Sequence, residues 1–431
     1  TLVSDAAGSG PLTGVVAVAP GVRQTCARLA SGEARCWGRN HDGRLGDGTT
    51  ATHLRPTPVI DPYGEAQPFT GAVRVSAGAA HTCAIDGGHR AWCWGSNAFG
   101  ALANPDVGLA DVPTPVLDPA GTGPLTGVAD LDAGWNHSCA VLTDGTAACW
   151  GDGSLTDSPL PVPVPDTDGD GLLTGVRRIS AGEWETCALR EDATVACWSA
   201  GDHAPQVVLD VAGGSPLADV VDLSVGDDHT CVALATGQAR CWYRTGGSLP
   251  QVVLGPSGTD PLEEVVAISA GDDSTCVVLA SAQARCWGNN PGDGTGSQPL
   301  PVAVSNASGT GPLTGVTTVD VGQDRSCATT ADGTAWCWGG LPVGDGTLTS
   351  RSRPVALSGH YPGSPPLAGV TRVTTGGLHS CATVAGGQVR CWGRNDRGQL
   401  GDGVAMNVLP LDGGSLVFQL RPTVVVRPSE P

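Results

Sequence analysis

The sequence predicts an all-β fold, a single β-propeller of eight four-stranded repeat units with a disulfide in each blade. Three observations support this. Two cysteines ten residues apart recur eight times, with Trp after each second cysteine. Successive first cysteines lie 57, 56, 48, 44, 45, 51 and 54 residues apart, a length that suits four short strands. The 64 Gly and 33 Pro residues make the chain too turn-rich for long helices.

Each unit is expected to contain four strands in a fixed order. In the first unit these are residues 15–19, a strand carrying Cys26, a strand carrying Cys36 and Trp37, and residues 55–60. The fourth strand of the second unit is expected at 112–117. A Gly-Asp-Gly turn separates the third and fourth strands in most units. One such sheet cannot bury both of its faces, so the units are expected to stack around an axis.

The two cysteines of each unit lie symmetrically about a turn. In the first unit the turn centre is Ser31, and Gly32 follows at a place where a three-residue hairpin loop needs a left-handed residue. The cysteines therefore face each other across the hairpin, at a separation that a disulfide can bridge. Each bond would contribute about 2–3 kcal/mol. The alternative is reduced, buried cysteines; one hairpin does not present the four ligands that zinc needs. The predicted pairs are Cys26–Cys36, Cys83–Cys93, Cys139–Cys149, Cys187–Cys197, Cys231–Cys241, Cys276–Cys286, Cys327–Cys337 and Cys381–Cys391.

Composition limits the cellular locations and the classes of partner that fit this chain. Sixteen paired cysteines indicate an oxidising location, extracellular or at the cell surface, with the periplasm as an alternative. No apolar run approaches eighteen residues, so membrane insertion is not expected. The net charge is -19, and a strongly acidic chain is a poor nucleic-acid binder.

The termini flank the repeat array. Residues 1–14 are expected to form a ring-closing strand and a linker, residues 15–414 the eight-unit propeller, and residues 415–431 a C-terminal strand and tail. A strand at 1–4 that joins the last blade would remove an exposed sheet edge. The C-terminal strand either completes the last blade or adds to another subunit, which leaves self-association open.

The repeat resembles that of the regulator of chromosome condensation family. The similarity is clearest at residues 77–100 and 376–403, where Gly-x-x-His-Ser/Thr-Cys-Ala is followed by Cys-Trp-Gly-x-Asn. It implies a β-propeller, usually of seven blades, whereas eight units are present here. Family members include exchange factors on chromatin, a plant ultraviolet photoreceptor and a secreted bacterial inhibitor of β-lactamase. The secreted bacterial branch is the most similar, because this chain is acidic and rich in cysteine pairs.

The turn before each first cysteine varies between units, and a propeller would gather all eight turns on one face. Loops on a rigid scaffold are common binding sites. Exposed aromatic residues beside carboxylates could hold a protein, a sugar or a cation. The alternative is sequence drift in solvent-exposed turns, with the Trp residues packed on neighbours. The candidate residues are Trp135, Asn136, Glu183, Trp184, Asp227, Asp228, Asp272, Asp273 and Asp324.

Asp166, Asp168 and Asp170 have the spacing of a calcium-binding loop. Position twelve of such a loop is Arg177 rather than Glu, and other units carry an ordinary linker here, so an acidic turn is the alternative. Ca2+ is therefore a candidate ligand, and no cofactor is required.

Four histidines stand two residues before a first cysteine, which indicates a structural hydrogen-bonding role for His81, His137, His229 and His379. The sequence shows no nucleophile elbow, histidine-metal cluster or phosphate loop, so no enzymatic activity is expected. The favoured function is a protein-binding module that acts through its loop face. The alternative is a structural subunit of an extracellular assembly or filament, joined through its terminal strands.

Overall fold

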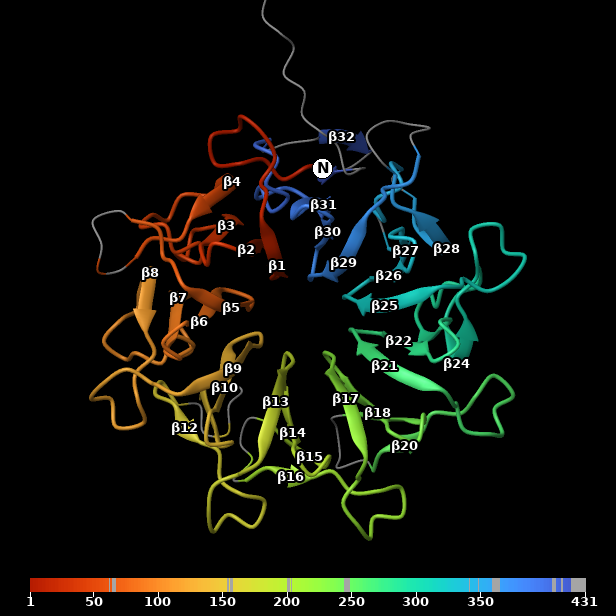
Figure 1. The fold of residues 1–431 in the computed structure, drawn as a ribbon, viewed down its shortest axis with the longest axis horizontal. Coiled ribbons are helices and arrows are strands. Elements are labelled where there is room, and N and C mark those ends of the chain that lie inside the picture. Colours follow the sequence, from red (N-terminus) through yellow and green to blue (C-terminus); the bar gives the residue numbers. More distant parts are fainter. Residues whose placement is uncertain are drawn as a thin grey trace, which may run out of the picture.

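The protein is a ring of eight antiparallel sheets around a central axis, as the computed structural model shows (Figure 1). The structure describes residues 1–404, except 62, 64–66, 153–154, 156–157, 200–201, 203, 244–248, 341, 348 and 359–364, and the backbone of 408–411 and 414–419. The eight-bladed all-β prediction is confirmed. No helix in the described part is long and apolar enough to cross a membrane.

The first blade sets the pattern for the others. Its strands β1 (Val15–Pro20), β2 (Gln24–Leu29), β3 (Ala34–Gly38) and β4 (His53–Pro58) pair in that order, from the axis outward. The strand β4 begins earlier than predicted, because a register shift lets His53 pair with Gly38 beyond the Cys36–Thr57 pair.

Six further blades repeat this order. They contain β5 (Ala72–Ala77), β6 (His81–Asp86), β7 (Ala91–Ser96) and β8 (Leu109–Pro115); β9 (Val128–Ala133), β10 (His137–Leu142), β11 (Ala147–Gly151) and β12 (Val162–Pro163); β13 (Val176–Ala181), β14 (Glu185–Arg190), β15 (Val195–Ser199) and β16 (Gln206–Val207); β17 (Val220–Val225), β18 (His229–Leu234), β19 (Ala239–Tyr243) and β20 (Gln251–Val252); β21 (Val265–Ala270), β22 (Ser274–Leu279), β23 (Ala284–Gly288) and β24 (Gln298–Ala303); and β25 (Val316–Val321), β26 (Arg325–Thr330), β27 (Ala335–Gly339) and β28 (Arg351–Ala356).

The last blade joins the two ends of the chain. It contains β29 (Val370–Thr375), β30 (His379–Val384) and β31 (Gln388–Arg394), followed by β32 (Val408–Leu411) and β33 (Gly414–Gln419). Val3 N donates to Val389 O at 3.0 Å and Cys391 N donates to Thr1 O at 2.9 Å, so the N-terminal residues lie against β31 and close the ring. The outer position of this blade is thus shared between the chain start and β33, which pairs with Gly393 and Arg394.

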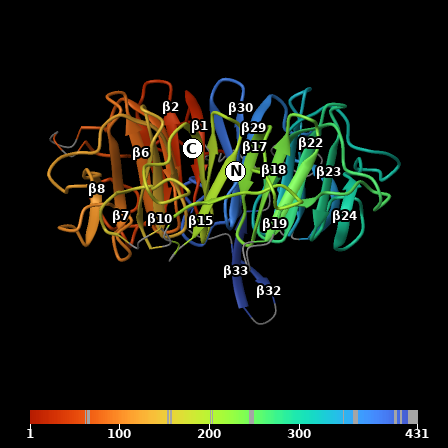
Figure 2. The same cartoon turned by 90° about the horizontal axis from the view of Figure 1, so that it is seen from below.

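The hairpin of β32 and β33 projects from the disc (Figure 2). The C-terminal prediction covered residues 415–431; of these, β33 joins the last sheet, and residues 420–431 lie outside the described residues.

Each predicted cysteine pair is a disulfide across the middle hairpin of its blade, with Cα–Cα distances of 4.1–4.2 Å. The loop that follows the second strand has the predicted left-handed residue. Gly32 has φ +84°, and three units hold the same conformation without glycine, at His89, Ala193 and Ala282 with φ of 59°, 62° and 56°. The backbone geometry of the hairpin therefore takes precedence over residue preference at these three turns.

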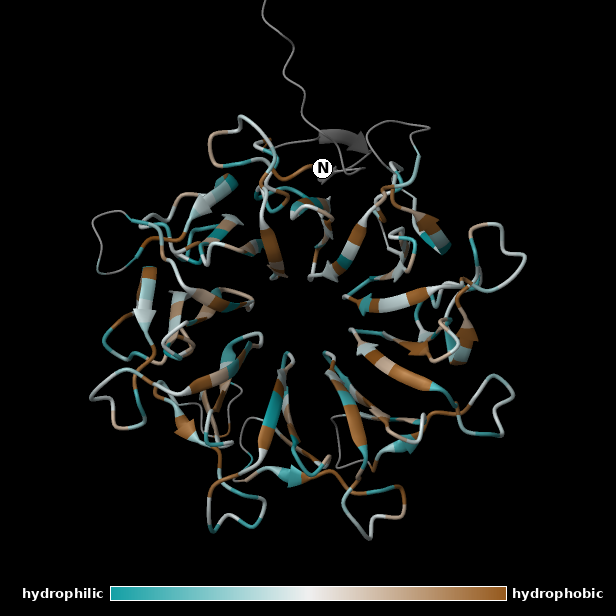
Figure 3. Ribbon diagram, viewed as in Figure 1, coloured by the Kyte–Doolittle hydropathy of each residue, from teal (hydrophilic) through white to brown (hydrophobic). Residues whose placement is uncertain are grey.

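The core lies between blades. Hydrophobic residues run along the strands of every blade (Figure 3). Seven of the eight Trp residues that follow a second cysteine, called here the framework Trp residues, are at most 6% exposed. The buried ones are Trp37, Trp94, Trp150, Trp198, Trp242, Trp338 and Trp392, and Trp287 is partly buried.

Candidate binding face

A ring of eight glycines holds the turns between the first and second strands. The glycine five residues before each first cysteine lies against the next blade: a Cβ on Gly21 would stand 2.7 Å from the carbonyl oxygen of Gly78, and a Cβ on Gly134 would stand 2.5 Å from that of Gly182. The same contact recurs around the ring and ends with Gly376 against Gly21, always within 3.0 Å. These contacts leave no room for a side chain. The sequence differences between the eight turns therefore fall on the two residues that follow each glycine.

The turns meet around one mouth of the central channel, as the sequence predicts. A cavity of about 260 Å³ is lined there by the first variable residue of each turn, including Trp135, Glu183, Asp227 and Asp272. We call this end of the ring the loop face.

The second variable residue of each turn lies outside the lining of this cavity. Five predicted residues occupy such positions, namely Asn136, Trp184, Asp228, Asp273 and Asp324. Trp184 is 42% exposed, whereas Trp135 is partly buried in the mouth, so the two aromatic residues differ in what they can contact.

Carboxylates from four successive blades crowd one side of the loop face. This acidic arc consists of Glu183, Asp227, Asp228, Asp272, Asp273 and Asp324. Burial, together with the charges of Asp272 and Glu183, raises the pKa of Asp227 to about 6, against an opposing hydrogen bond from Gln323. Burial and the neighbouring Asp273 and Asp228 raise the pKa of Asp272. Asp324 differs, because it accepts a hydrogen bond from Arg325 Nε at 3.0 Å.

Arginines gather on the other side of the loop face, in the first and last blades. This basic cluster consists of Arg23, Arg39, Arg394 and Arg397. Burial and the charges of Arg39 and Arg394 lower the pKa of Arg23. Arg394 pairs with Asp396 at 2.8 Å. Sequence reasoning missed this cluster, although Arg23 holds the turn position that Asp228 holds in the fifth blade. Asp396 also pairs with Arg397, and Asp42 pairs with Arg39, so these carboxylates offset part of the positive charge. The loop face is thus acidic on one side and weakly basic on the other.

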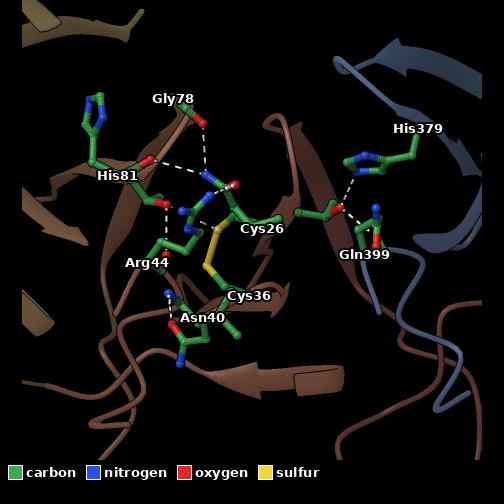
Figure 4. Close-up of a disulfide and its surroundings, with 12 residues drawn as sticks. Cys26, Cys36, Asn40, Arg44, Gly78, His81, His379 and Gln399 are labelled. Atoms are coloured by element: carbon green, nitrogen blue, oxygen red, sulfur yellow. Dashed lines mark hydrogen bonds between the residues drawn. A yellow bond between two sulfur atoms is a disulfide. The ribbon is translucent and has the colours of Figure 1, made fainter. Parts of the chain in front are cut away.

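The four histidines that stand two residues before a first cysteine, called here the framework histidines, connect neighbouring blades. His81 Nε2 lies 2.8 Å from Ser138 Oγ, His137 Nε2 lies 2.7 Å from Thr186 Oγ1, and His229 Nε2 lies 2.6 Å from Thr275 Oγ1. His379 Nε2 lies 2.6 Å from Thr25 Oγ1, which in turn donates to the Gln399 carbonyl oxygen at 2.9 Å (Figure 4).

Burial keeps these histidines neutral. It lowers the pKa of His81 and His379 to about 3 and that of His137 to about 4, and it also lowers the pKa of His229. The contacts agree with the structural hydrogen-bonding role that the sequence indicates.

The predicted calcium loop has the hydrogen bonds of an ordinary linker. Asp166 Oδ1 accepts from Asp168 N at 3.2 Å and from Asp170 N at 3.0 Å. Asp118 does the same for Thr122 N at 2.9 Å in the preceding linker.

Among the described residues, the only group of three metal-ligating side chains within 4.8 Å is Glu185 with the disulfide cysteines Cys187 and Cys197. The structure therefore does not bring Asp166, Asp168 and Asp170 together, and calcium binding stays a prediction.

Comparison with known proteins agrees with this geometry. The regulator of chromosome condensation (RCC1) repeat matches residues 31–85 and 89–141, and a second description of the same repeat matches 72–101, 128–155, 265–294 and 370–399. The chain contains repeats of the regulator of chromosome condensation family. Of the two regions that carry the sequence resemblance, residues 77–100 lie within these matches, and the second region is matched as far as residue 399.

Two known proteins are similar in sequence to part of this chain. The ultraviolet-B receptor UVR8 of Arabidopsis thaliana is 32% identical over 138 residues, which are 31% of this chain and 28% of the receptor. The human E3 ubiquitin-protein ligase HERC2 is 29% identical over 138 residues, 32% of this chain and 3% of the ligase. The chain thus aligns with less than a third of either relative.

Solved structures share the fold. The crystal structure of human WBSCR16 superposes with a TM-score of 0.54 at 17% identity, covering 88% of this chain and 86% of the other. Prp20p from Saccharomyces cerevisiae superposes with a TM-score of 0.53 at 19% identity, covering 85% of this chain and 92% of the other. At these identities the likeness establishes the propeller fold alone.

Proposed function

We propose that this chain is a protein-binding module that acts through its loop face in an oxidising, extracellular or cell-surface environment. The observation that carries the proposal is the charge-separated loop face, whose turns are fixed by the glycine ring. A fixed surface loses little conformational entropy on binding, and opposed charges orient a partner. Prp20p, which has the same fold, binds Gsp1p and histones.

Two further features support the environment and the mode of action. Eight disulfides persist where the surroundings are oxidising. Four histidines and carboxylates such as Asp132, which accepts a hydrogen bond from Ala181 N, are engaged in contacts between blades. These contacts support binding as the proposed mode of action.

The test is capture of a partner by immobilised protein from the material around the producing cell. The variant with Trp135→Ala and Trp184→Ala changes the loop face, and Asp118→Asn, in an exposed linker at the rim, is the control. We expect the control to retain the partner and the double variant to lose it. Equal retention by all three proteins would place the contact elsewhere and contradict the proposal.

One observation favours the alternative of a structural subunit. The hairpin of β32 and β33 projects from the disc, and β32 is the edge strand of its sheet in the described part. Edge strands are templates for pairing with another chain. If this were the main role, light scattering on the intact chain would show a large species, and deletion of residues 405–431 would return a monomer somewhat lighter than the 43.2 kDa of the full chain.

A further inference from the structure

In several blades, the segment after the third strand covers the framework Trp of the next blade. A Cβ on Gly46 would lie 2.8 Å from Trp94 Nε1, and a Cβ on Gly401 would lie 2.8 Å from Trp37 Nε1. The carbonyl oxygen of Ala101 accepts the Trp150 Nε1–H at 2.9 Å. The covered Trp residues are fully buried.

The fifth blade has a shorter segment at this place. Eight residues separate Trp242 from the outer strand β20, whereas fifteen separate Trp37 from β4. The framework Trp of the sixth blade, Trp287, is only partly buried. Segment length alone does not explain this, because only seven residues separate Trp198 from β16 and Trp242 is nevertheless buried. A cleft of about 400 Å³ lies between these two blades and is lined by Trp287, Tyr243 and Leu249. Residues 244–248 lie outside the described residues.

The cleft combines aromatic faces with carboxylates. Tyr243 is 70% exposed, and its ring centroid lies 6.1 Å from that of His229. Asp228, Asp272 and Asp273 line the same cleft from the neighbouring turns of the acidic arc. Among the described residues that line the cleft there is no arginine, and in the described part of the chain none of the ion pairs within 4.0 Å involves these three carboxylates. The described lining therefore carries a net negative charge.

We propose that the cleft between the fifth and sixth blades receives the cationic side chain of a partner protein, arginine foremost. A guanidinium group stacks its flat face on aromatic rings and donates hydrogen bonds to carboxylates from its edge. In this cleft Trp287 and Tyr243 supply the rings, and Asp273 supplies a carboxylate. The proposal rests on the proposed function, since Asp228 and Asp273 belong to the loop face, and it specifies the class of partner.

A second cleft nearby lacks this combination. It lies between the fourth and fifth blades, encloses about 570 Å³, and is lined by Trp198, Trp242 and Tyr243. Its two carboxylates are engaged within the protein: Glu185 accepts from the Thr230 hydroxyl, and Asp202 accepts from Ser199 N at 2.7 Å. Aromatic lining occurs in both clefts, and carboxylates that form no ion pair with another described residue distinguish the proposed one.

The probe is a short peptide, acetylated and amidated, with two arginines among glycines. Its counterpart carries citrulline, which has the same shape without the charge. Calorimetry measures binding of both peptides to the intact oxidised protein. We expect the arginine peptide to bind at least about tenfold more tightly than the citrulline peptide, and its affinity to fall as salt rises.

Variants locate the binding. Tyr243→Ala removes an exposed side chain, and Asp273→Asn removes one charge at almost constant shape. Each variant is expected to bind the arginine peptide about three- to tenfold more weakly than the original protein. Asp118→Asn, in an exposed linker, is the control with the same charge change away from the cleft. Unfolding temperature and the count of free thiols verify that each variant is folded.

Several results would overturn the proposal. These are equal binding of both peptides, unchanged affinity in both cleft variants, or salt-independent binding of a neutral oligosaccharide in place of the peptide. If the arginine peptide does not bind while the Trp135→Ala and Trp184→Ala variant still loses its captured partner, the cleft is wrong and the binding function stands. If neither variant set has an effect, both are wrong.

Discussion

At the scale of single residues, the glycine ring limits what the loop face can become. Gly134 and Gly182 each lie so close to the next turn that a methyl group would meet a carbonyl oxygen at 2.5 and 2.7 Å. Overpacking of this kind costs about 1–3 kcal/mol, because backbone atoms cannot move aside independently.

Gly134→Ala and Gly182→Ala are therefore expected to lower the free energy of unfolding by about 1–3 kcal/mol each. Denaturant unfolding of the oxidised protein measures the effect. Gly214, where an added Cβ would meet no atom within 4 Å, provides the control substitution to Ala. Similar losses at all three positions would show that the ring contacts are not the cause.

The hairpin turns offer a stabilising change. Ala193 and Ala282 hold a left-handed conformation, with φ of 62° and 56°, where Gly32 stands in the first unit. The strain of an alanine in this conformation costs more free energy than the conformational entropy that glycine would add to the unfolded chain. Ala193→Gly and Ala282→Gly are expected to stabilise the protein by about 0.5–1 kcal/mol each, measured by thermal unfolding. Destabilisation by either change would contradict this account of the turn.

At the scale of elements, the framework histidines make the contacts between blades dependent on pH. The folded-state pKa of His81 is lowered to about 3, against about 6.5 in the unfolded chain. A base with a lowered pKa favours the folded state most above pH 6.5, and this contribution is lost as the pH falls from 6.5 towards 3. Asp227 and Asp320 act in the opposite direction, because their pKa values are raised to about 6.

The comparison of His81→Gln with the original protein isolates the histidine contribution. The loss of stability between pH 7 and pH 5 is expected to be smaller in the variant by about 2 kcal/mol, because glutamine does not titrate. Thermal unfolding at a series of pH values measures it. Parallel pH profiles for the two proteins would mean that His81 takes up no proton on unfolding.

Much at this scale could be predicted from the sequence. The cysteine frame is local, so the spacing around Ser31 predicts the hairpin, its register and the Cys26–Cys36 bond. The repeat then predicts the blades, their number and the gathering of the turns on one face.

Features that depend on contacts between blades could not be predicted. Arg23 and Arg394 are far apart in sequence and meet only because the ring closes. The partial exposure of Trp287 is another such feature, because a segment of similar length in the fourth blade leaves Trp242 buried. Asp166 matches a calcium motif in sequence, but its carboxylate bonds to the backbone as in the other linkers.

At the scale of the whole molecule, ring closure depends on the first residues of the chain. Val3 is fully buried and its backbone bonds to Val389 in the last blade. Val3→Ala is expected to destabilise the protein by about 1–2 kcal/mol through loss of apolar burial. Val16→Ala, at an exposed position on β1, is the control, and unfolding in denaturant compares them. An equal effect of the two changes would mean that the chain start contributes little to closure.

The central claim is that the loop face, and its acidic arc in particular, contacts a protein partner. The chain has no lysine, so coupling of its carboxylates to lysine amines by a carbodiimide reports contacts with the partner. Mass spectrometry of the coupled complex then identifies the carboxylates involved. The account predicts links from partner lysines to carboxylates of the acidic arc, including those beside the cleft such as Glu183, Asp227 and Asp324. Links concentrated instead at the linker carboxylates of the rim, such as Asp118 and Asp168, would contradict it.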